Sequence, residues 1–286
     1  MDNILEIENL TKKYPDFALD TLSFSVPQGA IMGLIGENGA GKTTTINLIL
    51  NELKKDGGRI RIFGKDHLEH ERAIKEKIGV VFDDCHFPEL FSANEMELFM
   101  KDIYATWQSK TYRDYLKRFG LPQDKPIQAY SKGMKVKLSF AVALSHQPQL
   151  LLLDEATSGL DPVMRDEILG ILLEFVQDEK HGVLFSSHIT DDLEKIADYI
   201  TFIHKGKLLF SKTKDELIYY YGVIKCGAEM FSRIDEADII AHRKQDYEWQ
   251  VLVADKEEAR RKYKKCLIDS VTISEIMLFH VKGEKK

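Results

Sequence analysis

One short stretch of the chain is diagnostic, and it reads Gly36-Glu37-Asn38-Gly39-Ala40-Gly41-Lys42-Thr43. It fits the pattern G-x-x-x-x-G-K-[ST] at every fixed position. A short apolar run at 30–35, typical of a buried strand, precedes it, and a helical pattern at 42–51 follows it. A strand before the motif and a helix after it are the context that a phosphate-binding loop requires. The stretch therefore predicts a nucleoside triphosphate site in preference to a structural glycine turn.

Each part of this loop has a physical role in holding phosphate. Glycines let the backbone curl so that successive N–H groups face the phosphate, and the N-terminus of the following helix adds its dipole. We expect Lys42 to supply a cation to the β- and γ-phosphates and the Thr43 hydroxyl to bind Mg²⁺. The predicted nucleotide contacts are Gly36, Glu37, Asn38, Gly39, Ala40, Gly41, Lys42, Thr43 and Thr44.

A second motif, at 150–155, is an apolar strand that ends in the carboxylates Asp154 and Glu155. A strand with no polar face must be buried, and its last residue emerges at the carboxyl edge of the sheet, where α/β proteins place their ligands. We predict that Asp154 holds Mg²⁺, usually through water, and that Glu155 orients or deprotonates the attacking water. Buried strands often end in Asp, so the catalytic interpretation depends on the phosphate loop upstream.

Composition excludes several classes of protein. The 286 residues include 40 Lys and Arg against 46 Asp and Glu, which gives a formal charge of −6. This balance argues against a nucleic-acid partner, because backbone affinity comes from clustered Lys and Arg. No apolar run approaches the ~18 residues that span a bilayer, and the N-terminus lacks the pattern of a signal peptide. Three cysteines, Cys85, Cys226 and Cys266, indicate reduced thiols in a cytoplasmic protein.

Strand and helix patterns alternate along most of the chain, which indicates a largely parallel sheet covered by helices. Predicted strands are 5–8, 22–26, 30–35, 59–63, 150–153 and 183–186, with a hairpin around Gly206. Predicted helices are 42–51, 162–177 and 190–197. Between about 87 and 144 the pattern is helical, with a capping box at Ser92 and Glu95 and a second cap at Ser109. After 214 it weakens to one predicted strand, 247–253, and one charged helix, 256–265.

Four further motifs follow the order of a known family. Tyr130-Ser131-Lys132-Gly133-Met134 stands where a Leu-Ser-Gly-Gly-Gln signature is expected, Ser158-Gly159-Leu160-Asp161 is similar to the D-loop, and His188 follows a predicted strand as the switch histidine does. Tyr14 is similar to the aromatic that stacks on adenine. Over about residues 4–215 the chain thus resembles the nucleotide-binding subunit of an ATP-binding-cassette (ABC) transporter.

The resemblance implies a fold and a domain organisation. The fold is α/β, a P-loop NTPase of the ABC type with an antiparallel β subdomain, an inserted α-helical subdomain at about 84–146 and a small C-terminal α+β extension. The ABC nucleotide-binding domain is expected at 1–214 and the accessory extension at 215–286. In the extension, apolar spacing at Ile273, Ile276 and Met277 suits a docking helix, and a passive stabilising role is the alternative.

The resemblance also implies an ATPase that uses ATP and Mg²⁺ and works as a head-to-tail dimer, with a second copy or with a paralogue. Ser131, Lys132, Gly133 and Met134 would close on the γ-phosphate held by the opposite subunit, with Asp161 in the adjoining D-loop. His188 would sense the γ-phosphate, a role that an isolated core histidine would not have. Tyr14 would stack on adenine, unless it simply packs on the sheet.

Two departures from the family pattern concern charge. Lys132 replaces a signature glycine and either assists phosphate binding or faces solvent, and Met134 replaces a glutamine. Asp83 and Asp84 follow the strand that usually ends in the Q-loop glutamine. Asp83 is a candidate ligand of Mg²⁺-bound water, and the alternative is a simple link to the helical insertion.

Ser-Lys-Gly-Met-Lys in the signature is similar to the subgroup that serves ABC-2 type exporters of bacitracin or peptide toxins. The expected partner is therefore a transmembrane ABC-2 type permease subunit, and the expected location is cytoplasmic, peripheral on the inner face of the cell membrane. The helical insertion would carry a docking groove that uses two or three of its aromatic residues, Phe87, Phe91, Phe99, Tyr104 and Trp107.

Three rival functions are weaker. A nutrient importer ATPase is the alternative within the family. A soluble ABC ATPase acting on DNA or ribosomes usually has two cassettes, coiled-coil insertions or zinc-binding cysteines, and a GTP switch would need an Asn-Lys-x-Asp run; the sequence shows none of these.

Overall fold

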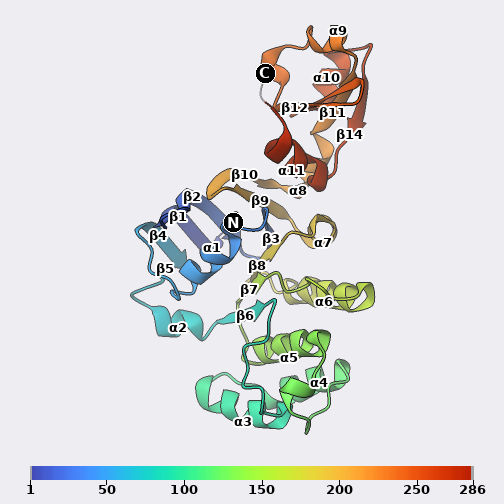
Figure 1. Ribbon diagram of the computed structural model, residues 1–286. Coiled ribbons are helices and arrows are strands. Elements are labelled where there is room, and N and C mark those ends of the chain that lie inside the picture. The colour runs from blue at the N-terminus through green and yellow to red at the C-terminus, as the bar shows by residue number, and fades with distance from the viewer. Residues whose placement is uncertain (1, 285–286) are drawn as a thin grey trace. The chain divides into compact units, whose positions relative to one another are not determined.

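The computed structural model describes residues 2–284, and the chain divides after Ser211 into two compact units (Figure 1). No helix within 2–284 is long and apolar enough to cross a membrane.

The first unit is built on a six-stranded sheet in the order β10-β9-β3-β8-β7-β6. From β9 to β6 every neighbouring pair is parallel. Its strands are β3 (Ala30–Ile35), β6 (Ile78–Phe82), β7 (Leu150–Asp154), β8 (Gly182–Ser187), β9 (Tyr199–His204) and β10 (Lys207–Thr213). β3, β7 and β8 are buried along their whole length, as continuous apolar runs in a helix-covered parallel sheet should be. The carboxyl ends of β3 and β7 therefore deliver the phosphate loop and the two carboxylates to one edge.

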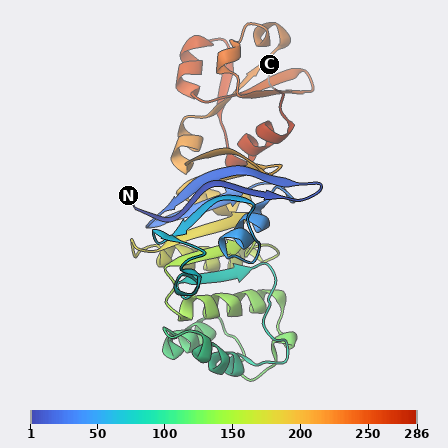
Figure 2. The ribbon, with the colours of Figure 1, turned by 90° about the vertical axis from the view of Figure 1, so that its left-hand side faces the viewer.

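A second, antiparallel sheet in this unit has the order β2-β1-β4-β5. Its strands are β1 (Asn3–Lys13), β2 (Ala18–Pro27), β4 (Gly57–Ile62) and β5 (Lys65–Asp66). One hydrophobic cluster joins Ile7 of β1 and Ile60 of β4 to Leu34 of β3 and to Ile46 of α1 (Lys42–Ile49). The helix that follows the phosphate loop is thus anchored to both sheets, which Figure 2 shows above and beside it.

The helices of this unit include a group beyond strand β6, formed by α3, α4 and α5 (Figure 1). The bounds of the helices after α1 are α2 (Glu71–Lys75), α3 (Ala93–Ile103), α4 (Ser109–Arg118), α5 (Lys132–Ser145), α6 (Pro162–Phe175) and α7 (Thr190–Ile196), with a 3₁₀ turn at Ile127–Ala129. α5 packs on β6, and α4 packs on α5. The α/β fold with an antiparallel sheet and a helical insertion is confirmed.

Local signals at the helix starts were only partly correct. The capping box predicted at Ser92 and Glu95 is present at the start of α3. The cap predicted at Ser109 is wrong: Ser109 is the first residue of α4, and Gln108 stands at the cap position without a side-chain hydrogen bond. A serine one residue inside the helix has the right chemistry at the wrong place, because only the cap residue has the extended backbone that aims its oxygen at the free N–H groups.

The second unit is a small α+β body. Its antiparallel sheet has the order β12-β13-β11-β14, formed by β11 (Gly222–Cys226), β12 (Ala241–Gln245), β13 (Glu248–Val253) and β14 (Leu267–Ser270). Its helices are α8 (Lys214–Tyr219), α9 (Ala228–Phe231), α10 (Lys256–Lys262) and α11 (Ile273–Lys282), with a 3₁₀ turn at Glu236–Asp238. The prediction of a single strand and a single helix was therefore incomplete. The edge strands β12 and β14 are short and polar, so they lack the alternation that marks a strand.

The apolar stripe of α11 is covered in this structure. Ile273 and Ile276 are fully buried, and Phe279 is nearly so, with the Arg243 guanidinium 4.7 Å from its ring centre. Met277, the third predicted position, is half-buried. The burial of Ile273 and Ile276 supports the passive stabilising alternative, and a docking role for the helix stays a prediction.

We expect His146 to make the helical insertion sensitive to acid. It is 1% exposed, its Nδ1 lies 3.2 Å from the Glu76 carbonyl oxygen, and its ring stacks on Tyr104 with the ring centres 4.0 Å apart. Burial lowers the pKa of His146 to about 4 from an ordinary value near 6.5. The unfolded chain therefore takes up this proton first, so the stabilisation is complete above pH 6.5 and is lost as the pH falls to 4.

We expect the free energy of unfolding to fall by about 3 kcal/mol over this pH interval through His146 alone. Urea denaturation at several pH values should show that His146→Gln loses this part of the pH dependence. The exposed His70, replaced in the same way, serves as the control. An unchanged pH dependence in His146→Gln would show that other groups cause the acid lability.

Candidate functional site

The phosphate loop connects β3 to α1 and closes around the ammonium group of its own lysine. Lys42 Nζ donates to the carbonyl oxygens of Gly36, at 2.8 Å, and Glu37, at 3.3 Å. Two positions in the loop have room only for glycine. A β-carbon on Gly36 would lie 2.4 Å from the Ile203 carbonyl oxygen. A β-carbon on Gly41 would lie 2.4 Å from the Leu19 side chain, and Gly41 also has φ +114°. The loop is therefore held in a curled form with a cation at its centre.

A cavity of 520 Å³ opens on this loop. It is lined by Phe17, Asn38, Gly39, Gly41, Lys42, Thr43, Thr44 and Glu155. Five of the predicted contacts in the loop line it together with Thr44, whereas Gly36 and Glu37 contribute carbonyl oxygens to Lys42.

The aromatic residue at this cavity is Phe17, which the sequence did not single out. Tyr14 is 39% exposed and its ring centre lies 6.2 Å from that of Phe17. The backbone N–H of Tyr14 donates to the Phe17 carbonyl oxygen at 2.7 Å, so a tight turn brings the two rings together. An aromatic three residues after Tyr14 was the available signal, and adenine stacking by Tyr14 stays a prediction.

Asp154 ends β7 as a buried carboxylate, 4% exposed, beside the first turn of α1. It accepts a hydrogen bond from Ser186 Oγ at 2.9 Å and another from Thr43. Burial raises the pKa of Asp154 above its ordinary value, and these hydrogen bonds act in the opposite direction. A buried carboxylate beside a threonine hydroxyl is a donor set suited to a hard divalent cation.

Glu155 connects the phosphate loop to the switch histidine. Its Oε1 lies 3.1 Å from Lys42 Nζ, and its Oε2 is in hydrogen-bonding contact with His188 Nδ1. The His188 backbone N–H also donates to Oε2 at 3.3 Å. Glu155 has φ +54°, an unfavourable backbone conformation for a residue with a side chain. This strained turn redirects the side chain from the line of the strand toward Lys42, so residues far apart in sequence meet at one point.

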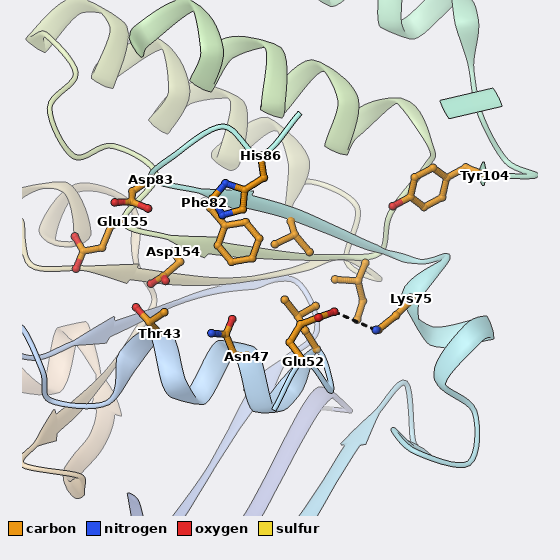
Figure 3. A pocket seen from close by; sticks show the side chains of 13 residues that line it. Thr43, Asn47, Glu52, Lys75, Phe82, Asp83, His86, Tyr104, Asp154 and Glu155 are labelled. Atoms are coloured by element: carbon orange, nitrogen blue, oxygen red, sulfur yellow. Dashed lines mark hydrogen bonds and ion pairs between the residues drawn. The ribbon is translucent and has the colours of Figure 1, made fainter. Parts of the chain in front are cut away.

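Asp83 follows β6 and lines a neighbouring cavity of 580 Å³ with Thr43, Asp154 and Glu155 (Figure 3). In Figure 3 the carboxylates of Asp83, Asp154 and Glu155 lie at the same end of this cavity. The other end is formed by Glu52, Lys75 and Tyr104, among others, and His86 lies between the two ends, stacked on Phe82. The structure thus places Asp83 at the predicted edge, and its role as a metal ligand stays a prediction.

The signature residues lie at the start of α5. Ser131 is the N-cap and accepts a hydrogen bond from the Met134 backbone N–H at 3.3 Å, and Lys132 is the first helical residue. A β-carbon on Gly133 would lie 2.4 Å from the Met164 side chain, so this glycine allows α5 and α6 to approach closely. Lys132 lines a cavity of 190 Å³ in which the phosphate loop takes no part.

Asp161 caps α6 by accepting hydrogen bonds from the backbone N–H groups of Val163 and Met164, both at 3.0 Å. The structural role of Asp161 is therefore that of a helix cap, and a contact of its D-loop with a second subunit stays a prediction.

Comparison with known proteins agrees with this arrangement. The family model described as "ABC transporter" matches residues 19–158. The chain is 35% identical to the bacitracin transport ATP-binding protein BcrA of Bacillus licheniformis, over 73% of this chain and 69% of that protein. It is 33% identical to the lantibiotic transport ATP-binding protein SrtF of Streptococcus pyogenes, over 74% of this chain and 92% of that protein.

Among solved structures, the ATP-binding subunit of an ABC transporter aligns with a TM-score of 0.69 and 26% identity, over 76% of this chain and 92% of that one. The phosphate loop, the buried carboxylate strand and these likenesses agree, and the chain belongs to the family of ATP-binding subunits of ABC transporters.

Proposed function

We propose that the chain hydrolyses ATP to ADP and phosphate and that this reaction powers export through separate membrane subunits. The observation that carries the proposal is the position of Glu155 between Lys42, at 3.1 Å, and His188. A carboxylate held beside a phosphate-binding ammonium group is suited to orient a water molecule and accept its proton. The neighbouring imidazole of His188 holds the Glu155 carboxylate in place. When the γ-phosphate takes the place of this carboxylate beside Lys42, His188 senses the phosphate.

The residues present fit ATP and Mg²⁺. The curled loop and its buried ammonium group, 5% exposed, suit the phosphate groups, and Thr43 and Asp154 offer the oxygen ligands that Mg²⁺ prefers. Bound Mg²⁺ supplies positive charge against the phosphate oxygens. Thr43 and Asp154 would hold it, with Asp83 as a further candidate through water. Lys42 neutralises phosphate charge, and Glu155 is the candidate general base.

A second subunit completes the site in this proposal. Ser131 and Gly133 lie at the N-terminus of α5, an anion-binding position of a helix that is fourteen residues long. Within this chain the loop cavity is lined by none of the signature residues. A head-to-tail pair of copies, or a pair with a paralogue, would bring the signature of one subunit to the phosphate loop of the other.

The membrane partner would dock where two cavities adjoin. The 580 Å³ cavity and one of 700 Å³ share Lys75 and Tyr104. Of the predicted groove aromatics, Tyr104 lines both cavities, and Phe99 is 46% exposed. Phe91 contacts Phe99, and Trp107 contacts Tyr112, so Phe91 and Trp107 serve mainly in packing. We infer that a short helix of an ABC-2 type permease contacts this region and that the chain lies on the inner face of the cell membrane through it.

Two relatives are named for the transport of bacitracin and of lantibiotics, and these names favour export over import. We therefore propose a peptide, toxin or antibiotic as the substrate class, with a nutrient importer as the alternative. The partner is tested by identifying the neighbouring genes and co-expressing the chain with any multi-helix membrane protein that they encode. A solute-binding protein encoded there would favour import instead.

Phosphate release tests the reaction itself. The purified chain should release phosphate from ATP in the presence of Mg²⁺, and EDTA should stop the release. A metal-independent reaction, or none, would contradict the proposed chemistry.

A further inference from the structure

Two charged stretches of the chain face the same small cavity. Its volume is 190 Å³, and it is lined by Asp83, Asp84, Cys85, Tyr130, Lys132, Lys135 and Val136. The first three follow β6, and the others belong to the signature stretch and to α5. The cavity is therefore lined by two acidic and two basic residues.

The two lysines differ in their partners. Lys135 Nζ lies 3.7 Å from a carboxylate oxygen of Glu89. Lys132 forms no ion pair within 4.0 Å with any carboxylate in residues 2–284. It is also the first residue of α5, where the helix dipole disfavours a cation. The helix thus gains nothing from the charge of Lys132, which is exposed. Asp83 and Asp84, which line the same cavity, are the charges that it would offset.

Lys132 also borders the D-loop. A β-carbon on Gly159 would lie 3.3 Å from Lys132 Nζ and 3.8 Å from its Cε, so the end of the lysine side chain runs beside this glycine. Gly159 has φ +73°, which glycine adopts without strain. One side chain therefore borders the D-loop and lines a cavity together with the loop after β6.

Asp83 connects this cavity to the catalytic edge. It lines the 190 Å³ cavity and also the 580 Å³ cavity, where Asp154 and Glu155 lie (Figure 3). Three carboxylates at one edge repel one another and repel phosphate, and a cation that lines the smaller cavity together with Asp83 would offset part of this charge.

We propose that Lys132 is a positioning residue that balances the charge of Asp83 and Asp84 and so couples the start of α5 to the catalytic edge. This inference rests on the proposed ATPase function and explains both charged departures from the family pattern together. It also defines a competing role: if Lys132 instead contacts the nucleotide phosphate of the opposite subunit directly, its effect does not depend on residue 83.

A double-mutant cycle separates the two roles. Lys132→Gln should lower ATP turnover about fivefold when Asp83 is present and less than about twofold when Asp83→Asn is also present, since a pair of exposed charges contributes up to about 1 kcal/mol. Lys132→Arg, which keeps the charge, should restore turnover. Lys110→Gln, at an exposed lysine of α4 outside the cavity, is the matched control and should have no effect.

The same loss from Lys132→Gln in both backgrounds, or no rescue by arginine, would overturn the coupling. If Asp83→Asn by itself removes turnover, the ATP affinities of the single and double variants are measured by calorimetry instead. Additive changes in ATP affinity would also overturn the coupling. Absence of ATP turnover in the unaltered chain would instead contradict the proposed function, so the two failures are distinguishable.

Discussion

Replacing Glu155 with glutamine should abolish ATP turnover while tightening ATP binding. Turnover should fall by at least about 100-fold, because an amide cannot accept the proton of the attacking water. ATP affinity should rise about fivefold, because Glu155 Oε1 lies 3.1 Å from Lys42 Nζ and must give up this ion pair when phosphate binds. The amide no longer competes for the ammonium group. Phosphate release and calorimetric ATP titration measure the two effects on one preparation.

Glu52→Gln is the matched control for this experiment. Glu52 also lines the 580 Å³ cavity and is paired with a lysine, but its ion pair is with the exposed Lys75, 3.3 Å away. This variant should keep turnover and ATP affinity. If ATP holds the proposed head-to-tail dimer together until it is hydrolysed, Glu155→Gln should also remain dimeric in ATP during size-exclusion chromatography. Unchanged turnover in Glu155→Gln would contradict the assignment of the general base.

The part of the site that the sequence predicted is the part with a local pattern. The phosphate loop and the apolar run before Asp154 are each a single short segment of sequence. In each segment the required backbone conformation or burial determines which residue types can occur. The pairing of Lys42 with Glu155 is different in kind, because it depends on strand order: β3 and β7 lie on either side of β8, and no short-range pattern encodes this. Ser186, the hydrogen-bond partner of Asp154, was missed for the same reason.

The fold was predicted best where burial is complete. β3 matches its predicted range, since every residue in it is apolar or small and buried. The second unit was predicted least well, because β12 and β14 have exposed polar residues and depend on pairing with β13 and β11 for their conformation. A strand whose residues are stabilised mainly by its neighbour carries little signal of its own.

Phe17 shows how a turn can move the relevant aromatic. The family resemblance drew attention to Tyr14, while the side chain that lines the loop cavity is three residues further along. Only the turn between them, closed by the 2.7 Å hydrogen bond from Tyr14, brings both rings to this region. Sequence order alone does not distinguish which ring faces the nucleotide.

Mixing two inactive variants should restore activity if two copies form the proposed head-to-tail dimer. Lys42→Ala removes the buried ammonium group that organises the phosphate loop, and Ser131→Arg fills the N-terminus of α5 with a bulky side chain. In a mixed dimer both defects fall on one composite site, because the loop of one subunit meets the signature of the other, and the second site is intact. A one-to-one mixture should therefore recover about one quarter of the original turnover, since half of the dimers are mixed and each keeps one of two sites.

Ser131→Thr, which keeps the hydroxyl group and the helix cap, is the control for Ser131→Arg and should stay active alone. Each arginine or alanine variant by itself should be at least about 100-fold less active than the original chain, because both of its composite sites are defective. Subunit exchange is measured before the assay, so that a lack of mixing is not mistaken for a lack of complementation. A fully exchanged mixture no more active than its parents would contradict a site shared between two copies of this chain and would favour pairing with a paralogue, since only a different partner could then supply the missing signature.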